Sequence, residues 1–345
     1  MNPGAEKKKA DDEIIPEAAD LTAQAARNDI ALVVLGHVSG EGSDRPRAEF
    51  YLTDKEKQLV KDVTTAYHAA GKKVVVLLNI PGAIEMESWK DIPDAILCMY
   101  QGGEQFGNWV ADVLTGAVTP SGKLIVTFAK DLMDYPSSKN YPILDEKLGM
   151  SGMAAGASGF TRKDKMTTDG TRNKDYTIYE EGIYVGYRYF DTFGVDVTYP
   201  FGYGLSYTTF EYSNPKITKD GDEFTVSVTI KNTGNYCGRE VAQLYVSAPK
   251  GTLDKPKKEL KGFAKTKTLK PGESETLTMT VKAEDLASFN PAKSQWETDK
   301  GEYTFLIGAS VADIKASLAG AVDKAYIKKV RNVLAPPIAI RELKP

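Results

Sequence analysis

The sequence predicts a two-part protein in which an incomplete, doubly wound α/β domain with a mostly parallel sheet precedes an antiparallel β-sandwich. In the first third, apolar runs such as residues 30–36 (IALVVLG) alternate with stretches of helical periodicity, as in a parallel sheet. In the last third, apolar and polar residues alternate singly, as in strands with one buried face. The chain opens with a helical stretch, so we expect the sheet to lack its first strand or strands.

Helices and strands of the first domain are expected in alternation. The helix at 53–70 is the best defined, because Thr53 and Glu56 form a capping-box pattern ahead of apolar residues at helical spacing. The continuous apolar run at 30–36 is typical of a strand that is buried on both faces. The other expected helices lie at 16–27 and 103–114, and the other strands at 73–78, 95–99 and 124–128.

Three segments with single-residue alternation, at 224–230, 276–281 and 303–307, predict strands of the β-sandwich. Between the two parts, the segment 148–175 is rich in small and charged residues and is interpreted as a mobile insertion or linker. Residues after about Leu318 are interpreted as a tail. The predicted domains are a partial α/β domain at 1–135, a linker and insertion at 136–205, the sandwich at 206–320 and a C-terminal tail at 321–345.

Composition narrows the class of partner. The net charge is -3 and the Lys/Arg clusters are short, so we expect neither a nucleic acid nor a membrane as partner. Cys98 and Cys237 are both expected to be free thiols. His37 and His68 do not have zinc-ligand spacing, and no metal or other cofactor is expected. Residues 1–12 lack the apolar core of a signal peptide, and the compartment stays unknown.

The candidate catalytic residue is Glu41, which follows the expected strand 30–36. Loops after the carboxyl ends of parallel strands form the ligand crevice of open α/β sheets. Gly40 and Gly42 allow unusual backbone angles around it, and Asp44 and Arg45 can pair to support the loop. A partly desolvated glutamate suits general acid catalysis. Taken by itself, however, a glycine-flanked glutamate is more often an ordinary loop residue.

The segment 39–45 (SGEGSDR) resembles the acid/base loop of glycoside hydrolase family 3, in its β-glucosidase type. Further segments resemble the family in the same order and together span most of residues 20–310. They are 50–53 (FYLT), 73–79 (KVVVLLN), 101–104 (QGGE), 120–124 (PSGKL), 179–189 (YEEGIYVGYRY), 200–207 (PFGYGLSY), 232–234 (NTG) and 240–246 (EVAQLYV).

The resemblance implies the C-terminal part of an enzyme built from a barrel, an α/β sandwich and a fibronectin type III-like domain, which hydrolyses terminal β-linked sugars of an oligosaccharide or glucoside with retained configuration. It implies that Glu41 is the general acid/base and that the nucleophile is an aspartate on the barrel. No Ser-Asp-Trp stretch of the kind that carries this aspartate occurs here. The chain is therefore expected to be inactive by itself, with the barrel supplied by the same gene or by a separate chain.

Several points stay open. Ser43 stands where relatives often carry an aromatic residue, so aglycone preference does not carry over. Full-length relatives are often periplasmic or secreted in bacteria. The aromatic segment 184–190 is interpreted as packing between domains, with Arg188 paired to a nearby acid, rather than as a sugar platform. The alternative function is that of a non-catalytic carbohydrate-binding or scaffolding protein of the same two domains. A sheet that lacks strands also predicts an open edge and an uncovered apolar face.

Overall fold

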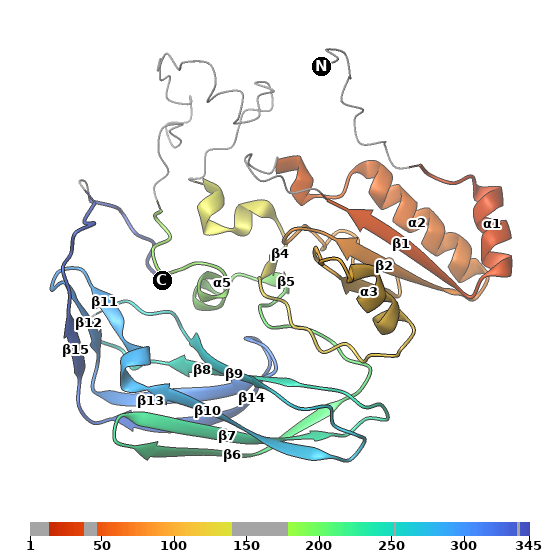
Figure 1. The fold of residues 1–345 in the computed structure, drawn as a ribbon. Coiled ribbons are helices and arrows are strands. Elements are labelled where there is room, and N and C mark those ends of the chain that lie inside the picture. The colour runs from red at the N-terminus through yellow and green to blue at the C-terminus, as the bar shows by residue number, and fades with distance from the viewer. Residues whose placement is uncertain (1–13, 38–46, 140–178, 252, 337–338) are drawn as a thin grey trace, which may run out of the picture. The chain divides into compact units, whose positions relative to one another are not determined.

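The computed structural model describes residues 14–37, 47–139, 179–251, 253–336 and 339–345, and the chain divides into two compact units (Figure 1). The first unit is formed mainly by residues 1–107 with 129–132, and the second by 108–128, 133–142 and 166–345. Among the described residues, no helix is both long enough and apolar enough to span a membrane.

The first unit contains a parallel three-stranded sheet. Its strands are β1 (Ile30–Gly36), β2 (Lys73–Asn79) and β3 (Ala95–Cys98), in the order β1-β2-β3. Helix α1 (Ala18–Arg27) packs against α2 (Asp54–Ala69), and α2 packs on β1 and β2. The predicted fold class is therefore confirmed for this part of the chain: strands alternate with helices and run parallel.

Helix α2 begins as the sequence predicts. The Thr53 side chain accepts a hydrogen bond from the Glu56 amide at 3.1 Å, and the Glu56 carboxylate accepts one from the Thr53 amide at 2.7 Å. This reciprocal pair satisfies two of the amides that a helix start leaves without partners. Val60, Val63 and Tyr67 are buried on the side of α2 that faces the sheet.

Strand β1 is buried on one face only, which corrects the prediction of burial on both faces. Its alternate residues Ala31, Val33 and Leu35 are buried, whereas Ile30, Leu32 and Val34 are 51%, 49% and 57% exposed. The physical reason is that α2, with α1 packed against it, covers one face of this sheet, and β1 is an edge strand among the described strands. An apolar stripe on an edge strand favours association with other chains.

Replacing Leu32 and Val34 by threonine is expected to reduce aggregation of the purified chain. Threonine keeps the strand preference of the backbone and removes exposed apolar surface, so stability should change by no more than about 0.5 kcal/mol. The matched control is Val33→Thr on the buried face, which should cost about 1–3 kcal/mol. Light scattering and thermal unfolding measure both effects. Unchanged aggregation of the Leu32/Val34 variant would contradict this interpretation of the exposed face.

Two expectations for the region after β3 need adjustment. Helix α3 (Phe106–Leu114) forms, but none of its residues is buried. The predicted strand 124–128 is wrong: only β4 (Phe128–Ala129) is a strand. The reason is long-range hydrogen bonding, because the Leu124 amide donates to Tyr203 O at 2.7 Å and Leu124 O accepts from the Gly202 amide at 2.8 Å.

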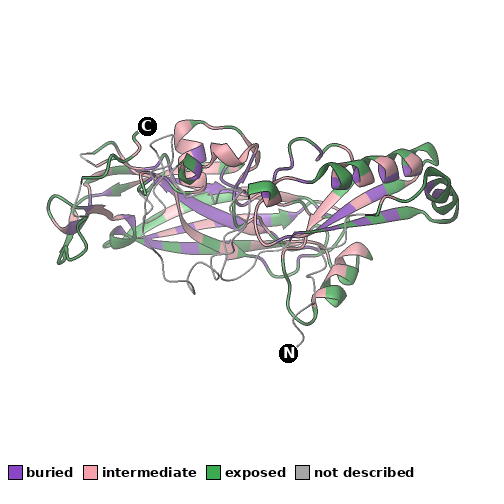
Figure 2. Ribbon diagram, turned by 90° about the horizontal axis from the view of Figure 1, so that it is seen from above, coloured by how far each residue is buried: buried purple, intermediate pink, exposed green. Residues whose placement is uncertain are grey.

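The second unit contains the predicted antiparallel β-sandwich, and the alternating segments are confirmed as strands. One sheet has the order β10-β7-β6 and the other β14-β13-β8-β9. The strands are β6 (Phe210–Asp220), β7 (Glu223–Asn232), β8 (Val241–Ser247), β9 (Glu259–Lys265), β10 (Ser274–Lys282), β13 (Gly301–Gly308) and β14 (Ile314–Val322). Burial alternates along β7, β10 and β13, and their buried side chains belong to the core of the sandwich. Figure 2 shows buried and exposed residues alternating along strands of the chain.

The remaining elements of the second unit are short. A small sheet joins β11 (Ser288–Asn290), β12 (Gln295–Thr298) and β15 (Tyr326–Lys329), and β4 pairs with β5 (Val197–Tyr199). Helix α5 spans Tyr187–Phe193. Strands β14 and β15 thus continue regular structure past Leu318, where the sequence suggested a tail. The insertion predicted at 148–175 lies outside the described residues.

Candidate functional site

The predicted acid/base Glu41 and its supporting residues Gly40, Gly42, Asp44 and Arg45 lie outside the described residues. Their placement therefore stays a prediction. The structure describes the residues on both sides of this segment. His37 follows β1 directly, and the 3₁₀ helix Arg47–Phe50 begins where the description resumes.

The segment starts at the carboxyl edge of the parallel sheet. The His37 amide donates to Asn79 O at 3.1 Å, so the chain leaves β1 beside the end of β2. Next along this edge, the Met99 amide donates to Leu78 O at 2.9 Å, and Tyr100 follows with φ 56°. A tyrosine in this left-handed region is uncommon and costs free energy. Open α/β sheets bind their ligands at this edge, where the carboxyl ends of the strands lie.

A buried scaffold holds the residues after the segment. Phe50 is buried, and its carbonyl oxygen accepts a hydrogen bond from the Glu85 amide at 2.7 Å. The Glu85 carboxylate in turn accepts from the Ser88 amide at 2.6 Å, and the Trp89 indole donates to Glu85 O at 2.8 Å. The 3₁₀ helix is therefore tied to the loop that follows β2.

A second tie holds Tyr51. Its hydroxyl donates to the Asp131 carboxylate at 2.9 Å, and the Leu132 amide donates to the same hydroxyl oxygen at 3.4 Å. Burial and the hydrogen bond to Asp131 raise the pKa of the Tyr51 hydroxyl, so it stays neutral and remains a donor. Asp131 thus joins the residues that fix the downstream end of the segment.

Sequence reasoning missed a buried pair at the upstream end. His37 is 6% exposed, and its Nδ1 lies 2.8 Å from Glu49 O. Its Nε2 lies 3.2 Å from Oε1 of the buried Glu56, an ion-pair contact rather than an aligned hydrogen bond. The sequence predicts no zinc site at the histidines and a capping role for Glu56, and neither prediction brings the two residues together. A polar residue that ends an apolar strand was the signal available.

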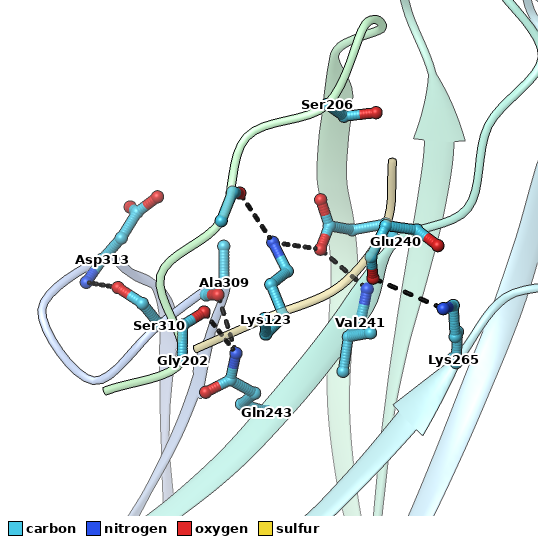
Figure 3. A network of polar contacts seen from close by, with 12 residues as sticks. Lys123, Gly202, Ser206, Glu240, Val241, Gln243, Lys265, Ala309, Ser310 and Asp313 are labelled. Atoms are coloured by element: carbon cyan, nitrogen blue, oxygen red, sulfur yellow. Dashed lines mark hydrogen bonds and ion pairs between the residues drawn. The ribbon is translucent and has the colours of Figure 1, made fainter. Parts of the chain in front are cut away.

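Other segments that resemble the family meet beside the start of β8 (Figure 3). The Lys123 ammonium group lies 2.9 Å from the Glu240 carboxylate and donates to Gly204 O at 3.2 Å. The same Glu240 oxygen accepts from the Val241 amide at 2.7 Å. These motif residues therefore connect segments of the second unit through a largely buried ion pair.

Gln243 makes the second half of this connection (Figure 3). Its amide nitrogen donates to Gly202 O at 3.1 Å and to Ala309 O at 2.8 Å, and its oxygen accepts from the Tyr245 hydroxyl at 2.6 Å. Gly202 has φ 80°, and a Cβ atom there would lie 2.1 Å from the Gln243 oxygen. Only glycine fits this position, because both the backbone angle and the close approach exclude a side chain.

The aromatic segment 184–190 packs within the second unit, whereas the sequence suggested packing between domains. The Tyr187 ring stacks on Phe201 with centroids 4.8 Å apart, and its hydroxyl accepts from the Leu260 amide at 2.7 Å. Arg188 pairs with Glu259 at 3.5 Å, as expected of a nearby acid. These rings are occupied by packing rather than presented as a sugar platform.

Comparisons with known proteins agree with this arrangement. Residues 7–187 match the sequence model of the glycosyl hydrolase family 3 C-terminal domain, and residues 240–311 match that of the fibronectin type III-like domain. A β-glucosidase of Ruminococcus albus is 36% identical over 341 residues, which are 96% of this chain and 32% of that protein. An exo-α-(1→6)-L-arabinopyranosidase of Bifidobacterium longum is 34% identical over 305 residues, which are 87% of this chain and 36% of that protein.

Solved structures give the same result. The structure of β-glucosidase 3B from Thermotoga neapolitana in complex with glucose is 43% identical, has a TM-score of 0.78, and matches 91% of this chain and 40% of that one. The chain therefore spans between about a third and two fifths of the length of these relatives. The matched domain models, the sequence identity and the shared fold together place the chain in glycoside hydrolase family 3.

Proposed function

We propose that this chain is the C-terminal part of a retaining, exo-acting β-glycosidase of the β-glucosidase type, and that it supplies the general acid/base Glu41 but not the nucleophile. The observation that carries the proposal is the position of Glu41. In the sequence it comes five residues after Gly36, the last residue of β1, and the described chain leaves β1 at the carboxyl edge of a parallel sheet, within a region that matches the C-terminal domain of the family.

The chemistry assigned to Glu41 has two steps. A carboxylate from outside this chain attacks the anomeric carbon while Glu41 gives its proton to the glycosidic oxygen, so the leaving alcohol departs neutral. The Glu41 carboxylate then takes a proton from a water molecule, which attacks the glycosyl–enzyme bond and releases the sugar and the first carboxylate. Retention requires the two carboxyl groups to lie about 5–5.5 Å apart.

A β-glucoside is the substrate class proposed first, because β-glucosidases dominate the named relatives. The relative named as an arabinopyranosidase shows that a similar C-terminal region also serves a different sugar. We therefore assign sugar selection to the part of the enzyme outside this chain, in keeping with the share of each relative that the chain covers.

The test compares the purified chain with a reconstituted enzyme. The chain by itself is expected to give no turnover of cellobiose or nitrophenyl β-glucoside. Mixed with the part of the Thermotoga neapolitana enzyme that lies outside the match, it should restore turnover. Turnover by the chain alone that Glu41→Gln abolishes would refute the missing-nucleophile part of the proposal. Failure to restore turnover, with glucan binding equal in the wild type and Glu41→Gln, would instead support the non-catalytic binding function.

A further inference from the structure

We infer that His37 is the positioning residue that ties together the two ends of the segment 38–46, by bridging the carbonyl oxygen of Glu49 and the carboxylate of Glu56 through its two ring nitrogens. The argument begins with geometry. His37 is the first residue after β1, Glu49 lies in the 3₁₀ helix after the segment, and Glu56 lies in the first turn of α2. Contacts from one imidazole thus reach both flanks of the segment.

The contacts favour a protonated imidazole. Nδ1 lies 2.8 Å from Glu49 O, and a carbonyl oxygen can only accept, so Nδ1 carries a proton. Nε2 faces Oε1 of Glu56 at 3.2 Å, and an ionised carboxylate also only accepts. A neutral imidazole carries a single proton and can serve one of these acceptors. The imidazolium form serves both.

Glu56 is itself held in place. Its Oε2 accepts the Thr53 amide at 2.7 Å while its Oε1 faces His37, so the two oxygens of one carboxylate are used by the helix cap and by the imidazole. Both His37 and Glu56 are buried. A buried charge requires a paired charge nearby, because desolvation of an unpaired ion is costly. Removal of either His37 or Glu56 would therefore leave the other one buried without its partner charge.

The charged groups that face His37 from the described elements around it are Glu56 of α2 and Glu49 of the 3₁₀ helix, whose carboxylate lies 3.5 Å from Nδ1. The buried Glu85 is bonded to Ser88 instead. The contact with the Glu56 carboxylate raises the pKa of His37 despite the opposing effect of burial, and the Glu49 contacts add to it. Burial opposes ionisation of Glu56, but its bonds to His37 and Thr53 outweigh it and lower that pKa.

These directions define a pH window. A raised His37 pKa gives stability that is fully present below pH 6.5 and is lost as the pH rises through the folded-state value. A lowered Glu56 pKa gives stability that is present above pH 4.5 and is lost as the pH falls through its folded-state value. The bridge is therefore complete between these two pH values; it weakens at higher pH as His37 deprotonates and at lower pH as Glu56 becomes protonated.

The first experiment is an NMR titration of the imidazole protons, which is simple because the chain has only two histidines. His68→Gln leaves His37 as the single signal. We expect His37 to titrate above pH 6.5, and to titrate below it in Glu56→Gln, where burial remains without the partner charge. Asp62→Asn on the same helix is the matched control and should leave the titration unchanged. Titration below pH 6.5 in the wild type would overturn the inference.

The second experiment measures hydrogen exchange of the amides in 38–46 near pH 6. His37→Gln should exchange faster, and His37→Arg, which keeps the charge and donates on two sides, should restore slow exchange. If His37→Gln does not fold, Glu56→Gln provides the same comparison. Unchanged exchange in a folded variant would overturn the positioning role.

The effect on catalysis, unlike these two measurements, rests on the proposed function. In the reconstituted enzyme, His37→Gln should lower kcat with little change in KM, and His37→Arg should extend activity to higher pH than the wild type. An absence of activity in every sample, together with the expected titration and exchange, would reject the proposed function and leave the His37 bridge standing.

Discussion

Replacing Glu41 by glutamine in the reconstituted enzyme is expected to lower turnover of cellobiose by about 10²–10⁴-fold, the usual contribution of a general acid/base. Glutamine has nearly the same shape but cannot transfer a proton. The sugar alkoxide is a poor leaving group, so the first step depends on that proton. Steady-state kinetics with cellobiose measures the loss.

A dinitrophenyl β-glucoside separates acid catalysis from misfolding, because its leaving group departs without a proton. Formation of the glycosyl–enzyme should therefore stay close to the wild-type rate in Glu41→Gln and appear as a burst of dinitrophenol. Glu87→Gln, which changes a partly exposed glutamate of the same unit, is the matched control. Equal losses with both substrates would mean that Glu41 is not the acid.

Replacing Asn232 by alanine is expected to destabilise the sandwich by about 3–4 kcal/mol, since four hydrogen bonds of about 1 kcal/mol each are lost. Asn232 is fully buried, and its oxygen accepts from the Thr208 hydroxyl at 2.7 Å and the Gly234 amide at 3.1 Å. Its nitrogen donates to Tyr236 O at 2.7 Å and Leu269 O at 2.9 Å. Every donor and acceptor of the side chain is used, and two of its partners, Thr208 and Leu269, are buried.

The measurement is the urea concentration at the unfolding midpoint of the second unit, with unfolding monitored by fluorescence and far-ultraviolet circular dichroism. Lys231→Ala, at the neighbouring exposed position of β7, is the matched control and should change stability by less than about 0.5 kcal/mol. A loss in Asn232→Ala no larger than the control would show that the amide network is satisfied by water in the variant.

The predictions that held rest on local chemistry. The capping box of Thr53 and Glu56 fixes the start of α2 within four residues, and single-residue alternation identifies β7, β10 and β13 because one face of each is buried. The resemblance to the family extended these local patterns to the order of the domains. These features can be predicted from residues that are close together in the sequence.

The predictions that failed depend on distant residues. Residues 124–128 have the composition of a strand, but Leu124 bonds to the backbone at Gly202 and Tyr203, almost eighty residues away. Strand β1 is apolar at every position, yet which face is covered is decided by the helices available. The His37 pair was missed for the same reason, because Glu49 and Glu56 lie 12 and 19 residues away along the chain. The role of Glu41 stays a prediction, since residues 38–46 lie outside the described part of the chain.

The ion pair of Lys123 with Glu240 has a consequence for how the protein can be divided. Lys123 lies inside the region matched by the first domain model and Glu240 opens the second, yet both belong to one compact unit. The boundaries of the two family matches therefore differ from the boundaries of the compact units. A chimaera that exchanged the sandwich at residue 240 would separate a lysine from its acid, whereas one that carried residues 119–124 along with the sandwich would keep them together.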